Sequence, residues 1–167
     1  MPDPLAGVPA PTGYTTTCDP AHTNRTISGS SASLTPGTYC GGIKIQGNGT
    51  ANLAAGTYVL LGGGLTVSPG NINGTHVTFY STYDATHAYG PLNIQGGAST
   101  ATLSAPISGS LAGVLWFADR TAPSGTVNFL SGGGVLSLTG ALYCKTQKLK
   151  WQGGTTGAAV YTQIVVT

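Results

Sequence analysis

The sequence predicts an all-β protein: a single-domain parallel β-solenoid (β-helix) with an irregular N-terminal arm or cap. The first observation is a repeated phrase, since Pro-Gly-Thr-Tyr at 36–39 returns as Ala-Gly-Thr-Tyr at 55–58. Glycines and then a short alternating run, 43–45 or 65–67, follow each copy. The second observation is composition: 27 glycines among 167 residues, with abundant threonine, favour strands and tight turns over helices. Self-similarity at a spacing of roughly 20–36 residues is typical of solenoids.

Two kinds of short strand are interleaved from residue 34 to the end of the chain. One kind ends in small residues and occurs at 43–49, 65–70, 92–97, 127–133 and 149–154. The other kind carries an aromatic side chain and occurs at 37–42, 56–63, 75–82, 112–120, 140–146 and 158–166. A single copy cannot bury its apolar face, whereas stacked copies share one core. We therefore expect equivalent strands of successive turns to form parallel sheets.

The alternating pattern also predicts which side chains point inward. We expect one internal ladder of Ile45, Val67, Ile94 and Phe129. A second ladder should begin with Tyr39 and Tyr58 and continue through some of the later aromatic residues Phe79, Phe117 and Tyr143.

The domain organisation follows from the same pattern. Residues 1–33 are rich in Pro, Ser and Thr and predict an arm or cap, while 34–167 hold the solenoid repeats. The segments 81–91 and 104–126 are longer than a minimal turn and should project as loops or cap an end.

Charge excludes some classes of partner. Only 6% of the residues are charged, there is no glutamate, and the net charge is +2. This is too little for the dense basic face that nucleic acid requires, and no run reaches the length of a membrane span. We expect self-association, other surface proteins or glycans as partners.

The three cysteines, Cys18, Cys40 and Cys144, fit no metal-ligand spacing. We favour a Cys18–Cys40 disulfide that fastens the arm to the first repeat, which leaves Cys144 as a buried free thiol. A reactive Cys144 nucleophile is the alternative, although no base lies near it in the sequence.

Several phrases together resemble the C-terminal β-solenoid segment of bacterial TadE/TadG-like proteins, which are encoded with tight-adherence (Flp) pilus loci. The phrases that carry the resemblance lie at 3–11, 34–49, 56–67, 77–82, 88–98, 103–109, 112–120, 140–153 and 161–166. The resemblance implies an extracellular or bacterial cell-surface location and a membrane-anchored precursor N-terminal to residue 1. It implies no catalytic site. Similar sequences usually have Phe-Pro where this chain has Cys144-Lys145, which leaves the role of that corner open.

The most plausible polar constellation combines the long insert with the end of an aromatic strand. Parallel β-helices often carry polysaccharide-active sites, which need clustered acids and a basic group. The candidate ligand-binding residues are Asp84, His87, Asp119, Arg120, Tyr83, Tyr89 and Trp116. Local pairing of Asp119 with Arg120, or of Asp84 with His87, would explain the charged members without any ligand.

These observations favour a structural or adhesive module over an enzyme, with no metal and no cofactor. The open strand edges of a solenoid add the expectation of end-to-end assembly into fibres. The alternative is a carbohydrate-binding or carbohydrate-active module that uses 81–91 and 112–120. Ice binding fits less well, because no regular Thr-x-Thr array recurs at fixed intervals.

Overall fold

A computed structural model describes residues 3–95, 97, 99–131, 134–152 and 161–165. Apart from one short 3-10 turn, the regular elements in this part of the chain are strands. Their bounds are η1 Pro20–His22, β1 Thr23–Ser28, β2 Ser31–Leu34, β3 Gly37–Gln46, β4 Gly49–Leu53, β5 Gly56–Leu61, β6 Leu65–Val67, β7 Gly70–Gly74, β8 Val77–Thr82, β9 Leu92–Ile94, β10 Thr100–Ser104, β11 Val114–Ala118, β12 Val127–Ser131, β13 Leu136–Tyr143, β14 Lys148–Gln152 and β15 Tyr161–Val165.

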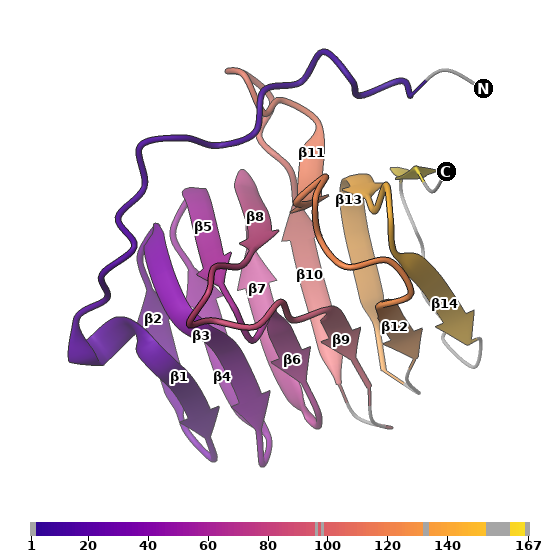
Figure 1. Cartoon of the computed structure of the whole chain (residues 1–167). Helices are drawn as coiled ribbons and strands as arrows, with labels where there is room; N and C mark the ends of the chain where they lie inside the picture. Colours follow the sequence, from indigo (N-terminus) through magenta and orange to yellow (C-terminus); the bar gives the residue numbers. More distant parts are fainter. Residues whose placement is uncertain (1–2, 96, 98, 132–133, 153–160, 166–167) are drawn as a thin grey trace.

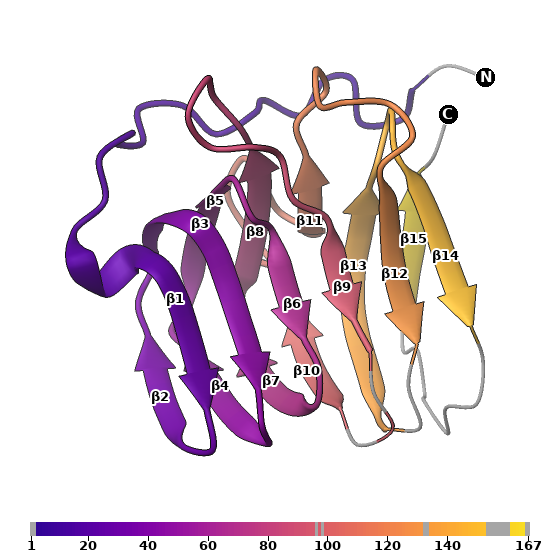
Figure 2. The same cartoon turned by 60° about the horizontal axis from the view of Figure 1, so that its bottom comes forward.

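The strands form three parallel stacks, which we call A, B and C (Figures 1 and 2). Stack A holds β1, residues 43–46 of β3, β6, β9, β12 and β14. Stack B holds residues 37–40 of β3, β5, β8, β11, residues 139–143 of β13 and β15. Stack C holds β2, β4, β7, β10 and residues 136–139 of β13. From β1 to β13 the chain visits A, then C, then B in each turn, so the predicted parallel β-solenoid is confirmed.

The inner ladder of stack A follows the prediction for three turns and departs from it in the fourth. Ile45 pairs with Val67 and Val67 with Ile94, but Ile94 is aligned with Leu130 and not with Phe129. Leu130 is fully buried, whereas Phe129 points outward beneath the Lys150 ammonium, 5.4 Å from the ring centroid. The prediction for Phe129 was therefore wrong by one residue, which in a strand reverses the face.

The aromatic residues of stack B form two rows and not one. Inside, the rings of Tyr39, Tyr58, Phe79 and Trp116 follow one another with centroids 5.9, 5.6 and 6.2 Å apart. Phe117 and Tyr143 do not continue this ladder, because they lie with Tyr80 on the outer face of the same strands. Adjacent aromatic residues in a strand must point to opposite faces, so both faces of stack B are apolar.

Stack C has a polar outer face without a charged residue in its strands. Hydrogen bonds between side chains join its turns: Asn52 to Ser31 at 3.2 Å and Asn73 to Asn52 at 3.3 Å. A second column runs from Thr50 to Asn71 at 3.2 Å and from Asn71 to Thr100 at 2.6 Å. These ladders satisfy amide and hydroxyl groups along the stack, so solubility on this face does not depend on charge.

Glycines allow successive turns to approach closely at the corner between stacks B and A. A Cβ built on Gly63 would lie 2.0 Å from the Gly41 carbonyl oxygen, and one on Gly90 would lie 2.0 Å from the Gly63 carbonyl carbon. No other residue fits without moving the backbone. The glycine runs that separate the strands in the sequence are therefore a packing requirement.

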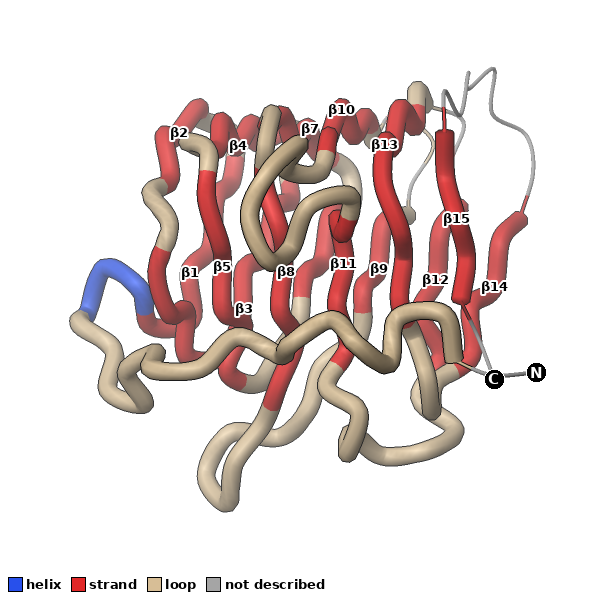
Figure 3. The backbone as a smooth tube through the Cα atoms, turned by 90° about the horizontal axis from the view of Figure 1, so that it is seen from above, coloured by secondary structure: helices blue, strands red, loops and turns tan. Residues whose placement is uncertain are grey.

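The N-terminal arm lies across the outer face of stack B, as the view from above shows (Figure 3). The solenoid itself begins within the segment predicted as the arm, since β1 and β2 already pair with β3 and β4. The arm proper therefore comprises residues 3–22, and its apolar side chains cover part of the outer apolar face. They are Leu5, Val8, Ala10 and Tyr14, against Val59, Tyr80, Val114, Phe117 and Tyr143.

Candidate functional site

Two long connections meet at the corner between stacks B and A. Residues 83–91 follow β8 and residues 119–126 follow β11, and these strands are neighbours in stack B. The Tyr83 hydroxyl donates a hydrogen bond to the Thr121 carbonyl oxygen at 2.9 Å, which joins the two connections. The fold thus brings together the two segments on which the sequence placed its candidate site.

Asp84 and His87 form a closed local pair within the first connection. One carboxylate oxygen of Asp84 accepts hydrogen bonds from the backbone N–H of Thr86 and of His87, both at 2.8 Å, and lies 2.9 Å from His87 Nδ1. The hydrogen bond from the Thr86 backbone is the main cause that lowers the pKa of Asp84 to about 2. Asp84 is an ionised turn residue, as the local-pairing interpretation expected.

Asp119 bonds to hydroxyl groups and not to its neighbour Arg120. Its Oδ2 accepts from Tyr80 at 3.0 Å and Thr82 at 2.7 Å, while its Oδ1 accepts from the backbone N–H and hydroxyl of Thr121. Burial alone would raise the pKa of Asp119, but the hydrogen bonds outweigh it and hold the pKa below the ordinary value. A general acid needs the opposite shift.

Arg120 turns away from the connection and holds the arm. Its Nη2 donates to the carbonyl oxygens of Leu5 and Val8 at 2.7 and 2.9 Å, and its Nε donates to the Tyr143 hydroxyl at 3.0 Å. The guanidinium lies over the ring of Phe117 with its carbon 4.9 Å from the centroid. Asp119 and Arg120 therefore serve different contacts, and the predicted pairing between them does not form.

The aromatic candidates have separate environments. Tyr83 is 36% exposed and meets Tyr89 edge to face, with centroids 6.2 Å apart. Trp116, by contrast, is only 1% exposed and belongs to the inner core. Because a sugar cannot reach its ring, Trp116 is not part of a ligand-binding site. Of the aromatic candidates, Tyr83 and Tyr89 lie together at the corner.

A second polar cluster lies where the arm meets β13, and sequence reasoning missed it. The Tyr143 hydroxyl donates to Asp3 Oδ2 at 2.6 Å and accepts from Arg120, so the three side chains form one chain of hydrogen bonds. That hydrogen bond from Tyr143 is the main cause that lowers the pKa of Asp3. A sequence signal existed in the apolar residues of the arm, Leu5, Val8 and Tyr14, which have no strand of their own to pack against.

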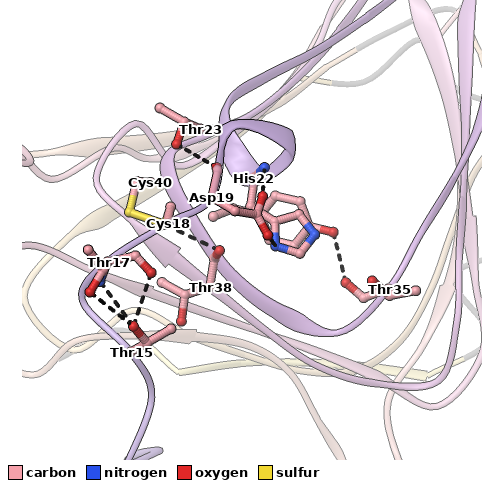
Figure 4. A network of polar contacts seen from close by, with 10 residues as sticks. Thr15, Thr17, Cys18, Asp19, His22, Thr23, Thr35, Thr38 and Cys40 are labelled. Atoms are coloured by element: carbon pink, nitrogen blue, oxygen red, sulfur yellow. Dashed lines mark hydrogen bonds and ion pairs between the residues drawn. A yellow bond between two sulfur atoms is a disulfide. The ribbon is translucent and has the colours of Figure 1, made fainter.

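The other end of the arm is fixed by the predicted disulfide (Figure 4). Cys18 and Cys40 are bonded, with Cα atoms 5.8 Å apart. The Asp19 carboxylate accepts from the His22 backbone N–H at 2.9 Å, and the His22 ring lies 4.4 Å from the Tyr39 ring. The short turn η1 therefore rests on the first aromatic ring of the inner ladder.

Cys144 is buried in the core, as expected for the third cysteine. Burial raises the pKa of its thiol to about 12, and the Asn128 amide Nδ2 lies 3.4 Å from its sulfur. Asn128 is itself fully buried, and its side-chain oxygen accepts from the Leu92 backbone N–H at 2.9 Å. A thiol with this pKa is protonated at neutral pH, which is unfavourable for a nucleophile.

In the described part of the chain, no cluster of three or more His, Cys or Asp side chains could hold a metal ion. Nor does any helix there have the length and apolar character needed to cross a membrane. Comparisons with models of protein families, with curated proteins and with solved structures find no match to this chain.

Proposed function

We propose that this chain is a structural and adhesive module of a bacterial cell-surface or pilus-associated protein, and that it assembles end to end into fibres. The observation that carries the proposal is the pair of open edges in stack A. Among the described residues, β14 pairs only with β12 and β1 pairs only with β3. The two ends of one stack thus offer complementary parallel edges, and a contact of this kind propagates without closing.

The exposure of β14 supports its role as an assembly edge. Four of its five residues are exposed, and Trp151, on the side of the strand that continues the inner row, is 39% exposed. Trp151 follows Leu130 in that row, so a further strand from another molecule would cover its ring. Natural edges are blunted by lysines, by proline or by inward-pointing charge. β14 has no proline and no charge at its inward positions Leu149 and Trp151, and its two lysines, Lys148 and Lys150, lie on the outer face. The opposite edge differs, because Arg25 of β1 is in register with the inward-pointing Ile43.

The state of the candidate acids supports a role without catalysis. Asp84 and Asp119 both have lowered pKa values and fixed hydrogen-bond partners, Asp84 within its own connection and Asp119 in β8 and its own connection. Polysaccharide cleavage by paired carboxyls requires one acid to remain protonated near neutral pH. In this account, the corner between stacks B and A stabilises the fold.

The extracellular location is part of the same proposal. The Cys18–Cys40 disulfide is compatible with an oxidising compartment, and a surface with few charges suits secreted β proteins. The resemblance to TadE/TadG-like sequences supports a place at the bacterial surface.

Sedimentation velocity over a concentration series tests the assembly. We expect the sedimentation coefficient of the unmodified chain to rise with concentration, and Trp151→Lys to abolish the rise by placing a charge in the continuing inner row. Gln152→Lys is the matched control, because it adds the same charge to the next residue on the opposite face of the strand. A monomer at every concentration, or equal behaviour of the two variants, would overturn the proposal.

Glycan binding is the second candidate, favoured by Tyr83. This ring is partly exposed and lies beside Tyr89 and the two long connections. A glycan array with the unmodified chain and with Tyr83→Ala tests it. Binding that disappears in the variant supports this candidate, and an empty array removes it.

A further inference from the structure

The arm is bound to stack B in the manner of a peptide ligand. Its backbone hydrogen bonds between residues 3 and 8 are internal, from Ala6 N to Asp3 O and from Val8 N to Leu5 O. This segment contacts the solenoid through its apolar side chains, through Asp3, which accepts from the Tyr143 hydroxyl, and through two carbonyl groups that accept from the Arg120 guanidinium. The arm is therefore held without being a strand of the sheet.

The receiving face has recognition elements at both ends of this segment. At one end, the Tyr143 hydroxyl bonds to the Asp3 carboxylate, and Arg120 bonds to the carbonyl groups of Leu5 and Val8. At the other end, Tyr14 packs edge to face on Tyr80, with centroids 5.9 Å apart. The outer face of stack B therefore recognises a peptide segment by an acidic side chain, two backbone carbonyl groups and an aromatic ring.

The receiving face is also wider than the arm. Two grooves lie beside it, of about 560 Å³ between the arm and the tip of the 105–113 connection, and of about 460 Å³ around Leu5 and Ile107. Both grooves border the 105–113 connection, one beside residues 9–15 of the arm and one beside Leu5, and they leave a route by which the arm can leave the face without moving any strand.

The junction between the arm and its anchor favours exchange. The disulfide fixes Cys18, whereas Gly13, Thr15 and Thr17 are exposed, and no atom lies within 4 Å of a Cβ built on Gly13. Gly13 has a φ of +74°, a conformation that costs glycine little, so this segment can redirect the chain. Residues 3–14 can therefore swing out about the exposed segment 15–17, with Gly13 giving the released arm further freedom, while the disulfide and the solenoid remain intact.

We propose that the outer face of stack B also accepts the arm of a second copy of this chain, which gives an arm-exchanged pair of molecules. An arm supplied in trans makes the same contacts as the arm in cis, so the exchange exposes no apolar surface that the monomer covers. The cis arm competes at an effective concentration of the order of millimolar, which keeps the exchanged form minor in dilute solution. This interface is independent of the strand edges proposed for end-to-end assembly.

Two complementary variants test the exchange. Chain X carries Arg120→Gln, which damages the receiving face and leaves the arm intact. Chain Y carries Leu5→Asp and Val8→Asp, which disable the arm and leave the face intact. Both also carry Trp151→Lys so that end contacts do not contribute, and circular dichroism confirms that both fold.

We expect X and Y to remain monomers separately and to form a 1:1 complex when mixed, because the arm of X docks on the uncovered face of Y. Sedimentation velocity of the mixture measures the complex. X mixed with X, and Y mixed with Y, are the controls. A mixture that stays monomeric at high concentration would overturn the proposal.

A second measurement does not depend on the folding of X. A labelled peptide with the sequence of residues 3–14 is titrated into Y and followed by fluorescence anisotropy. We expect saturable binding that weakens at least about tenfold when Arg120→Gln is added to Y, since a charged donor to two carbonyl groups is lost. A scrambled peptide that binds equally well, or no saturable binding to Y, would contradict the proposed recognition.

Discussion

Individual carboxylates in this molecule act as hydrogen-bond acceptors that fix loops and the arm. Asp84 closes a turn, Asp119 collects the hydroxyl groups of β8 and its own connection, and Asp3 binds Tyr143. In each case, the partners stabilise the ionised form and lower the pKa. The few acids of this chain are therefore structural in their observed contacts.

This arrangement predicts how stability depends on pH. Because the folded pKa values of Asp84 and Asp119 lie below the unfolded value of about 3.9, the unfolded state binds protons first and acid destabilises the fold. The stabilisation should be fully present above about pH 5 and lost as the pH falls toward about 2. Urea midpoints measured between these limits should fall less steeply for the double variant Asp84→Asn, Asp119→Asn. An unchanged acid slope in that variant would contradict this explanation.

The alignment of β12 decides which of Leu130 and Phe129 contributes more to stability. Leu130 is fully buried in the inner row of stack A, so Leu130→Ala should lower the free energy of unfolding by about 3 kcal/mol. Phe129→Ala removes a larger side chain from the outer face and should cost about 1 kcal/mol or less. Chemical denaturation of the two variants checks the order. If Phe129→Ala were the more destabilising, the alignment of β12 would be wrong.

The inward-pointing residue of 127–131 could not be predicted from the sequence alone. Alternation fixes the face of a strand only relative to a chosen first residue, and in 127–131 both Leu130 and Phe129 suit a core position. Asn128 makes the alternation harder to interpret, because a polar residue is unexpected at an inward position. In the structure, its side-chain oxygen accepts a hydrogen bond from the Leu92 backbone N–H. A similar ambiguity affects Trp116 and Phe117, where both faces of the strand are buried.

At the scale of elements, the arm and its disulfide act together. The Cys18–Cys40 bond spans 22 residues, which include η1, β1 and β2. Restricting a loop of this length in the unfolded chain stabilises a protein by about 3 kcal/mol. The paired variant Cys18→Ala, Cys40→Ala should lose stability of this order in thermal or urea unfolding.

Reduction of the disulfide in the unmodified protein is a control for the paired cysteine variant. Reduction of the unmodified protein should lower its stability to the level of the paired variant, because both lack the same cross-link. Reduction should leave the variant unchanged, since Cys144 forms no disulfide. A variant as stable as the oxidised chain would show that the first turn is held by its strand pairing alone.

The strands that lie in repeated segments of the sequence could be predicted, whereas the position of the non-repeated arm could not. The recurring phrases around Tyr39 and Tyr58 located the strands of stacks A and B. The arm has no repeat and no alternation, so its docking on stack B depends on the outer apolar face of other strands. Likewise, Asp84 and Asp119 could be assigned to neighbouring connections, but the arm contacts of Arg120 could not be read from 119–126 alone.

At the scale of the whole molecule, each side of the solenoid has a different character. Stack B is apolar on both faces and partly covered by the arm, while stack C presents side-chain ladders without charge in its strands. Stack A carries three lysines on its outer face, Lys44, Lys148 and Lys150, and open edges among the described residues at β1 and β14. The open edges of stack A are the surfaces proposed for end-to-end assembly, and the outer face of stack B is the side proposed to receive the arm of a second copy.

End-to-end assembly should be visible by negative-stain electron microscopy of the purified chain across a concentration series. We predict unbranched filaments one solenoid wide that lengthen with concentration, are absent for Trp151→Lys, and persist for Gln152→Lys. Isolated particles of constant size at every concentration would contradict end-to-end assembly and would bring glycan binding at the corner of Tyr83 to the front.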